Sequence, residues 1–535
     1  MTLPWFAGQL APLALALLLP LAGAAQAPPQ AHDSATDQAI RRYVQANRGR
    51  LLGELTSLLR LPNPASDRVA IRRNAEAIRA MMTARGLAPR FLEDADSATP
   101  PAVYGEWRVP GATRTLVFYA HYDGQPAAGG WRTDPWTPTL LTGPAERGGR
   151  AVDLESAIRT GNVVDEWRLY ARSASDDKAG VMAILGAVDA LRAAGARPTS
   201  NLRFFFEGEE EAGSPHLARM LDRHRALLAG ADAWIMVDGP RHPSGLRQVV
   251  FGVRGDVNVD LTVYGATRPL HSGHYGNWAP NPAMMLAQLL ASMKDSTGRV
   301  RIAGWYDDVV PLGAEELRAI AEAPAPDSAL REELGLGAGF TSETGVAPGA
   351  GARATSLAEA INLPSLNVNG IRSGDVGAAA RNVIPTVASA VLDLRLVQGN
   401  DVQRQVARLE QHVRARGFHV LDHEPSATER AAHYPIATLT VRPGGYDAER
   451  TPMDHPVARS VVAALRRMDP APLVRVPTLG GSLPLVTFRQ VLGATTLTVP
   501  VANHDNNQHA ENENLRLGNL WEGIASMAAI MTAGR

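Results

Sequence analysis

The chain has 535 residues, of which 53 are basic and 54 acidic, so its formal net charge is -1. This length exceeds what a single hydrophobic core supports, and two or more domains are expected. The balanced charge gives no electrostatic footprint for nucleic acid or an anionic membrane surface, and the absence of cysteine excludes disulfides, thiolate metal ligands and a cysteine nucleophile.

The first residues have the pattern of an export signal. Residues 10–21 are almost entirely Leu, Ala and Pro, a run too short to cross a bilayer comfortably. Cleavage after Ala24 or Ala27 would satisfy the Ala-x-Ala preference. We expect a signal peptide over residues 1–27, a Pro, Ala and Gln-rich flexible leader over residues 28–37, and an exported protein, periplasmic or secreted. An uncleaved anchor and a misassigned start codon are the alternatives. No later stretch reaches about 18 apolar residues, so no stable membrane association is expected after cleavage.

Helical and strand patterns alternate in the next part of the chain. Apolar periodicity predicts helices over residues 38–60 and 68–86 and over Val181–Ala194. Short apolar runs bounded by polar or Gly-rich turns predict buried strands at Leu116–Ala120, Trp167–Tyr170, Leu202–Phe206, Ala233–Val237 and Thr495–Val499. This alternation is typical of an α/β domain with a mainly parallel sheet.

The middle of the chain has a different pattern. Apolar and polar residues alternate over Gln248–Tyr264 and Ser389–Val397, which indicates an antiparallel sheet with one solvated face. Strand character returns at Ala437–Arg442, and helices are predicted at Pro282–Met293 and Val402–Arg416.

The change of pattern indicates two domains, one inserted into the other. We expect a catalytic domain over residues 38–247 and 448–535, interrupted by an inserted α+β domain over residues 248–447. Residues 322–355 of the insertion are rich in Gly, Ala and Pro and are expected to form a long loop or lid region.

Histidine and carboxylate side chains follow the predicted strands of the first domain. In open parallel sheets, ligands bind beyond the carboxyl ends of the strands. Each acidic turn could by itself be a solvated loop or a helix cap. Their joint occurrence at equivalent strand ends favours a metal site, because crowded carboxylates repel one another and need cations. The residues concerned are His121, Asp123, Asp176, Glu210, Glu211, Asp238 and His509.

These segments resemble one protein family. The matching motifs are Ala120–Asp123, Ser175–Gly180, Glu207–Ser214, His271–Gly273, and His509 with Asn512 and Glu513. In this order they resemble the co-catalytic di-zinc metallopeptidases, a family that includes carnosinases, bacterial dipeptidases, glutamate carboxypeptidase, acetylornithine deacetylase, aminoacylase and succinyl-diaminopimelate desuccinylase. A stretch with Asp134, Pro135 and Trp136 is most similar to the carnosinase and dipeptidase branch. The resemblance implies an α/β, zinc-exopeptidase-like catalytic domain interrupted by an inserted α+β lid and dimerisation domain.

The resemblance also implies a role for each catalytic-domain residue. One metal would be held by His121 and Asp238, and the second by Glu211 and His509, with Asp176 bridging both. Asp123 would orient the imidazole of His121. Two divalent ions are implied, zinc in the first place, with manganese or cobalt as alternatives.

The remaining roles concern catalysis and substrate binding. Glu210 resembles the general base, and His271 resembles a histidine that stabilises the oxyanion from the partner subunit of a homodimer. Arg395 resembles the residue that holds a substrate carboxylate, although a cross-strand pair on the solvated sheet face would also explain it. Gly481 and Ser482 resemble a Gly-rich substrate loop.

Three functions fit this pattern. The first is a dipeptidase or carboxypeptidase acting on small peptides, and the second is a deacylase or aminoacylase acting on N-acyl amino acids at the same metals. The third is a non-catalytic homologue that serves as a binding module, which loss of Glu210 or of a ligand would favour. All these residues are present, and the Trp-containing stretch favours a peptidase.

Overall fold

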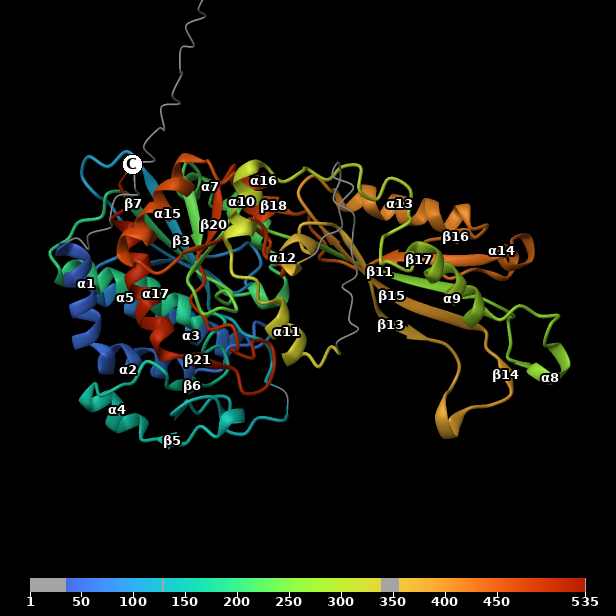
Figure 1. The fold of residues 1–535 in the computed structure, drawn as a ribbon, viewed down its shortest axis with the longest axis horizontal. Helices are drawn as coiled ribbons and strands as arrows, with labels where there is room; N and C mark the ends of the chain where they lie inside the picture. Colours follow the sequence, from blue (N-terminus) through green and yellow to red (C-terminus); the bar gives the residue numbers. More distant parts are fainter. Residues whose placement is uncertain (1–34, 128, 338–355, 535) are drawn as a thin grey trace, which may run out of the picture.

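The computed structural model describes residues 35–127, 129–337 and 356–534. The chain forms two lobes joined side by side into an elongated molecule (Figure 1). The predicted signal peptide lies outside the described residues, and the first helix, α1 (Ala35–Ala46), begins within the last residues of the predicted leader. Within the described part of the chain, no helix has both the length and the apolar character needed to cross a membrane.

The larger lobe is built on an eight-stranded mixed sheet in the order β1-β2-β7-β3-β8-β20-β9-β19. The strands β7, β3, β8 and β20 run parallel, as the apolar runs predict, whereas β1, β2 and the β20–β9 step are antiparallel. The bounds are β1 (Arg90–Leu92), β2 (Ala102–Trp107), β3 (Thr115–His121), β7 (Asn201–Glu207), β8 (Ala233–Met236), β9 (Gln248–Val250), β19 (Val474–Val476) and β20 (Thr496–Thr498).

Helices cover both faces of this sheet, because every second residue of each central strand points to the same side. On one face, Leu116 and Phe118 join a core formed mainly by six helices; on the other, Val117 and Tyr119 pack against three. The first group is α1, α2 (Arg48–Leu59), α3 (Arg68–Ala84), α5 (Lys178–Ala193), α15 (Pro456–Met468) and α17 (Leu517–Met531). The second is α6 (Leu217–Arg223), α7 (Arg225–Leu228) and α16 (Leu485–Leu492).

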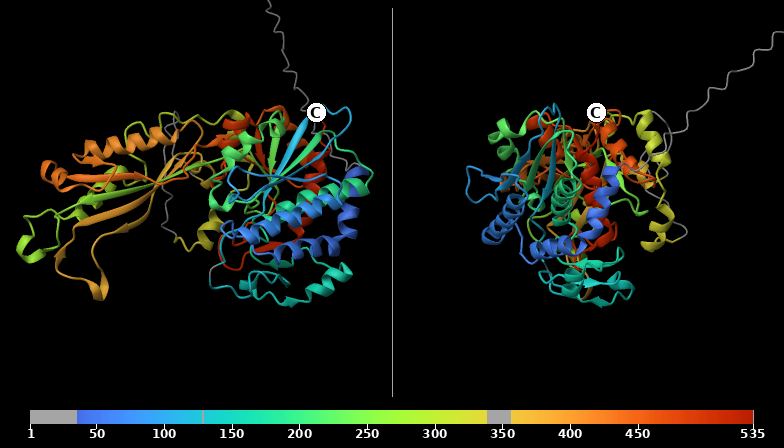
Figure 2. Two further views of the ribbon diagram at one scale, coloured as in Figure 1. Left: turned by 180° about the vertical axis from the view of Figure 1, so that it is seen from behind. Right: turned by 90° about the vertical axis from the view of Figure 1, so that its left-hand side faces the viewer.

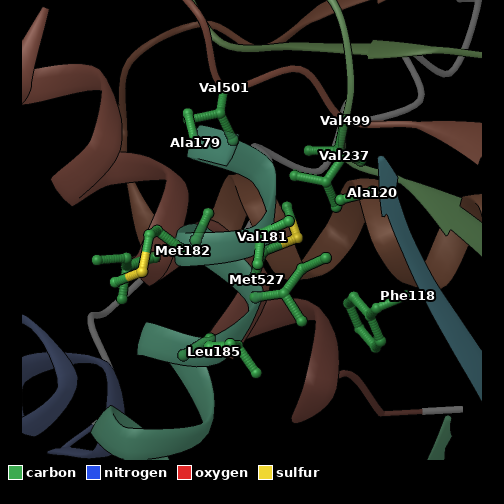
Figure 3. Close-up of a cluster of buried hydrophobic side chains, with 14 of the residues drawn as sticks. Phe118, Ala120, Ala179, Val181, Met182, Leu185, Val237, Val499, Val501 and Met527 are labelled. Atoms are coloured by element: carbon green, nitrogen blue, oxygen red, sulfur yellow. The ribbon is translucent and has the colours of Figure 1, made fainter. Parts of the chain in front are cut away.

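Helix α5 is the central helix of this lobe. Val181 and Leu185 on α5 lie beside Met527 of α17 and face Phe118 of β3 (Figure 3). Thirteen of the sixteen residues of α5 are buried, so the position of its first turn is fixed by the core. The loop immediately before α5, which carries Asp176, is therefore held against the sheet.

One predicted strand lies elsewhere. The run at Trp167–Tyr170 forms β6 (Arg168–Tyr170), which belongs to a separate four-stranded sheet in the order β21-β6-β4-β5 and not to the main sheet. Its neighbours are antiparallel: β4 (Thr139–Leu141) and β21 (Asn514–Arg516), with β5 (Ala151–Val152) and the short helix α4 (Leu154–Thr160) at its edge. A short apolar run indicates that both faces of a strand are buried, but it does not indicate to which sheet the strand belongs.

The second lobe contains a five-stranded sheet, in the order β13-β15-β11-β17-β16. Burial alternates at every residue along β11 (Gly255–Tyr264), which is the predicted half-buried pattern. Helices α9 (Pro282–Met293) and α13 (Val402–Ala415) share a core with this sheet. The other strands are β13 (Ser365–Arg372), β15 (Val387–Leu396), β16 (His419–Leu421) and β17 (Ile436–Val441).

The chain passes between the lobes through short strands. The predicted single run Gln248–Tyr264 is divided into β9, β10 (Gly252–Val253) and β11, and only β11 lies in the second lobe's sheet. On the return, β18 (Glu449–Arg450) pairs with β10. The predicted helix over residues 38–60 is likewise divided, into α1 and α2, at Asn47.

Two further groups of elements lie outside the eight-stranded and five-stranded sheets. At the end of the second lobe farthest from the catalytic sheet are β12 (Leu270–His271), α8 (Ser272–Tyr275) and β14 (Val383–Ile384), with α14 (Ala427–Ala432) on the same lobe (Figures 1 and 2). Between the lobes lie α10 (Ala314–Glu322), α11 (Asp327–Glu333) and α12 (Leu357–Ala360). Helix α10 packs on β19 of the larger lobe. The expected long loop over residues 322–355 thus contains a helix, and its residues 338–355 lie outside the described ones.

Candidate metal centre

Five segments bring histidine and carboxylate side chains to one edge of the eight-stranded sheet, and one of them is the loop before α5 that carries Asp176. Strand β3 ends at His121, and Asp238 follows two residues after β8 ends. Because β3, β7 and β8 are parallel, their carboxyl ends meet at this edge. Strand β7 leads into a short 3-10 turn that begins at Glu210. The loop between β20 and β21 supplies His509.

The side chains form two groups that share Asp176. In the first, His121 Nε2 lies 2.9 Å from Asp176 Oδ1 and 3.9 Å from Asp238 Oδ2. In the second, His509 Nε2 lies 3.2 Å from Asp176 Oδ2 and 3.0 Å from Glu211 Oε2. Within each group the nitrogen and oxygen atoms lie within 4.8 Å of one another. The two oxygens of Asp176 therefore face different groups, as a bridging carboxylate must.

The electrostatics of the site call for cations. Burial, together with the neighbouring Asp176 and Glu211 and against the pull of His121, raises the pKa of Asp238 to about 7. Burial also raises the pKa of Glu210, to which Asp238, Glu211 and Asp176 add. Carboxylates that are buried from solvent and lie this close together are costly to ionise without a compensating positive charge. A donor set of imidazole nitrogens and carboxylate oxygens fits zinc, manganese or cobalt.

Asp123 is completely buried behind His121 and does more than orient its ring. Its Oδ1 lies 3.4 Å from His121 Nδ1, which matches the predicted contact. In addition, its two oxygens accept hydrogen bonds from the backbone N–H groups of Glu210, at 3.1 Å, and Glu211, at 3.0 Å. One carboxylate thus sets the imidazole and the turn that carries both glutamates.

The two neighbouring glutamates are held differently. Gln125 Nε2 donates to Glu211 Oε2 at 2.9 Å, which fixes Glu211 towards His509. Glu210 points to the other group, with Oε2 3.9 Å from His121 Nε2. Sequence reasoning did not identify Gln125, because a glutamine in a loop carries no pattern of its own.

Glu513 is the main residue whose role the sequence pattern left unassigned. It is buried and accepts hydrogen bonds from the backbone N–H groups of Ser173, Ser175 and Asp176 at 2.9–3.0 Å. Its carboxylate also accepts from the Ser175 hydroxyl at 2.9 Å and pairs with buried Arg172 at 2.9 Å. Glu513 thereby shapes the loop that presents Asp176.

Asp177 anchors the same loop to the sheet and to α5. Its Oδ1 accepts from the backbone N–H of Gly180 at 3.1 Å and caps α5, and its Oδ2 accepts from the backbone N–H of His121 at 3.2 Å. Asp177 therefore has a structural role in holding this loop.

Arg395 and Ser482 lie together at the junction of the lobes. Arg395, on β15, donates from Nη1 to Ser482 Oγ at 2.9 Å and lies 3.0 Å from Asp393. Gly481 beside it is exposed. Tyr446 connects this pair to the metal-ligand cluster: burial raises its pKa, the Glu210 carboxylate adds to the rise, and a hydrogen bond from Ser482 opposes it. Tyr446 carried no signal in the sequence.

His271 is not brought to the cluster. It ends β12 at the tip of the second lobe and its ring stacks on His274 with centroids 4.5 Å apart. Figures 1 and 2 place this tip away from the eight-stranded sheet. Within one chain, His271 therefore does not face the residues expected to bind metal.

Two histidine and carboxylate groups that share one carboxylate, at one edge of the larger lobe's sheet, are the arrangement expected of a two-metal hydrolase. Comparison with known families agrees. The sequence model of peptidase family M20/M25/M40 matches residues 117–533, and the chain belongs to this family.

Individual relatives place it in the carnosinase and dipeptidase branch that the motifs resemble. It is 24% identical to the human Beta-Ala-His dipeptidase over 448 residues, which cover 83% of this chain and 79% of that protein. It is also 24% identical over 450 residues to the Cys-Gly metallodipeptidase of Saccharomyces cerevisiae, covering 83% and 84% of the two chains.

Solved structures show the same fold. An M20 family metallo-carboxypeptidase from Sulfolobus solfataricus superposes with a TM-score of 0.70 at 25% identity, covering 90% of this chain and 98% of that one. Human carnosine dipeptidase 1 superposes with a TM-score of 0.67 at 22% identity, covering 94% and 99%.

Proposed function

We propose that this peptidase is a metal-dependent dipeptidase that cleaves the amide bond of dipeptides or small peptide-like substrates. The observation that carries the proposal is the pair of groups that share Asp176, with Glu210 beside them. The relatives named as dipeptidases align with 83% of the chain, which supports the substrate class.

Five residues would hold the metals: His121 and Asp238 on one side, Glu211 and His509 on the other, and Asp176 between them. Two divalent ions bound there, zinc in the first place, would supply a water of lowered pKa and polarise the scissile carbonyl.

Glu210 is suited to move the proton. Its neighbour Glu211 is turned away by Gln125, and the Glu210 carboxylate faces the His121 side of the cluster. Burial and nearby carboxylates raise the pKa of Glu210. A general base works best with a pKa near the working pH, so Glu210 can accept a proton from the attacking water and return it to the leaving amine.

The carboxylate of the substrate would bind at Arg395. A guanidinium can offer two parallel donors to a carboxylate, and the hydrogen bond from Arg395 to Ser482 Oγ holds this one at the junction of the lobes. A substrate held there by its terminal carboxylate presents the preceding amide bond to the metals, which makes the enzyme an exopeptidase.

A homodimer through the second lobe follows from the same proposal. His271 lies at the tip of that lobe, where Trp278 is 80% exposed. A second copy that covered this tip could receive His271 at its own metal centre. Sedimentation of the purified protein would test this, and a monomer at assay concentration with full activity would refute it.

Export is a further part of the proposal and rests on residues 1–27. Fractionation of producing cells followed by N-terminal sequencing tests it. Full-length protein retained inside the cell would contradict it.

The reaction itself is tested by supplying purified protein with zinc, manganese or cobalt and measuring released amine from dipeptides and from N-acyl amino acids. We expect faster turnover of dipeptides. Turnover of N-acyl amino acids alone would identify a deacylase, and bound metal without turnover of either class would identify a binding module.

A further inference from the structure

A cavity between the larger lobe and the segment that joins the lobes has no proposed metal ligand in its lining. Its volume is about 330 Å³, at the lower end of the range for ligand pockets. Its lining is mainly apolar and includes Pro240, Ile320, Pro324, Ile361 and Leu479. A cavity of this size suits one side chain better than a stretch of peptide.

The cavity adjoins the substrate-binding residues on two sides. Pro240 follows Asp238 by two residues, so their Cα atoms are at most about 7.6 Å apart. Gly480, which also lines the cavity, immediately precedes Gly481 and Ser482. The backbone that would position a metal and the backbone that would position the substrate carboxylate therefore both form part of its wall.

The opposite wall of the cavity is formed by the segment between the lobes, which contains α10, α11 and α12. Ion pairs and hydrogen bonds hold this segment in place. Arg475 on β19 pairs with Glu315 at 3.2 Å and with Glu322 at 2.8 Å, which ties both ends of α10 to the sheet edge. Asp327 accepts from the backbone N–H of Leu357 at 2.8 Å and joins α11 to α12.

This wall reaches the substrate loop directly. A Cβ atom on Gly480 would lie 3.7 Å from Ile361 Cγ2, so the residue after α12 packs against the loop. A Cβ atom on Gly239 would lie 3.9 Å from Leu479 Cδ2, which closes the cavity against the Asp238 segment. The segments that contain Gly239, Gly480 and Ile361 therefore pack against one another and enclose the cavity.

We infer that this cavity binds an apolar side chain on the acyl side of the scissile amide, so that the enzyme prefers substrates whose first residue is large and apolar. The inference rests on the proposed dipeptidase function. Arg395 takes the carboxylate of the second residue, and the first residue then lies on the other side of the scissile bond, towards the metals and Asp238. Pro240, two residues further on, is where the apolar lining begins.

The test fills the cavity and leaves the metal-ligand cluster intact. Ile320→Trp and Ile361→Trp each add a large side chain to the lining from a different element. Leu317→Trp is the matched control, because Leu317 lies on the same helix as Ile320, is 55% exposed and does not line the cavity. Thermal unfolding of all three variants reports whether they fold.

The substrates form two series, Xaa–Gly and Gly–Xaa, in which Xaa is Gly, Ala, Leu or Phe. For the wild type we expect kcat/KM for Leu–Gly and Phe–Gly to exceed that for Gly–Gly by on the order of 10- to 100-fold, the value of burying one such side chain. Both filled variants should lose most of this preference and keep Gly–Gly turnover within about 3-fold, as should the control for every substrate.

Three results would overturn the inference: no preference for a large first residue, an unchanged preference in two folded filled variants, or a change confined to the Gly–Xaa series. If no dipeptide is hydrolysed, the dipeptidase proposal fails instead. Calorimetric binding of Leu–Gly and Gly–Gly to the metal-loaded Glu210→Gln protein, with and without Ile320→Trp, then decides whether the cavity takes the side chain. Equal affinities for the two peptides would refute it.

Discussion

Replacing Glu513 with glutamine should damage both the fold and the metal centre, although Glu513 is not an expected ligand. One oxygen of its carboxylate accepts three hydrogen bonds, from Ser175 N, Ser175 Oγ and Asp176 N, and the other accepts two, from Ser173 N and Arg172. A glutamine places an NH2 group at one of these positions, so two or three buried donors lose their acceptor.

The size of the effect follows from these contacts. Each buried donor left without a partner costs about 1–3 kcal/mol, so Glu513→Gln should lower the free energy of unfolding by about 2–5 kcal/mol. Loss of one partner from a buried ion pair gives a similar figure, about 3–5 kcal/mol. Because the loop carries Asp176, metal affinity should also fall, on the order of 10- to 100-fold.

Two measurements check this prediction. Urea unfolding of the chelated protein gives the free energy, and competition with a chromophoric chelator gives the metal affinity. Glu511→Gln is the matched control, since Glu511 lies two residues earlier and is exposed. A loss below about 1 kcal/mol with unchanged metal affinity would show that Glu513 does not hold the loop.

Four other outcomes are expected. Glu210→Gln should lower kcat by about 10²- to 10⁴-fold with unchanged metal content by elemental analysis, because it removes the proton acceptor and no proposed ligand. Arg395→Lys should raise KM by on the order of 10- to 100-fold for dipeptides but not for their C-terminal amides, since a two-pronged donor becomes a point charge. Chelation should lower the thermal midpoint, and zinc should restore it, because a ligand that binds only the folded state stabilises it. Burial tends to raise the pKa of Asp505, but Arg168 and Asn503 together lower it to about 2. In chelated protein, Asp505→Asn should therefore lower the free energy of unfolding by about 1 kcal/mol above about pH 4, a figure already reduced because the side chain is partly exposed. This difference from the wild type should disappear as the pH falls towards 2, where the carboxylate becomes protonated. A loss that is independent of pH would contradict this last assignment.

The central part of the fold could be predicted because its signals are local. The runs that become β3, β7 and β8 are apolar throughout, and parallel strands covered on both faces require this. Once these strands are parallel, the residues that follow them must meet at one edge, so the proximity of His121 and Asp238 follows from the sequence. The class of metallopeptidase, confirmed by the family match over residues 117–533, rests on the same motifs.

Other features depend on contacts between distant residues and could not be predicted. The run at Gln248–Tyr264 reads as one strand, yet β9 pairs with β19, more than 220 residues further along the chain, and stays in the main sheet. Gln125, Tyr446 and Glu513 are single polar residues whose roles come from long-range hydrogen bonds and burial. No periodicity or spacing marks such a residue before the fold is known.

The junction of the lobes bears on the length of the proposed substrate. Arg395 belongs to the second lobe, whereas Glu210 belongs to the metal-ligand edge of the first. Tyr446 lies between them: the Glu210 carboxylate is close enough to raise its pKa, and its phenol hydrogen-bonds Ser482, which accepts from Arg395 at 2.9 Å. Tyr446 and Ser482 therefore connect the surroundings of the proposed base with the proposed carboxylate anchor. We propose that a substrate whose carboxylate lies one residue beyond the scissile amide suits this arrangement, whereas an amide bond further from the carboxyl terminus would be held away from Glu210.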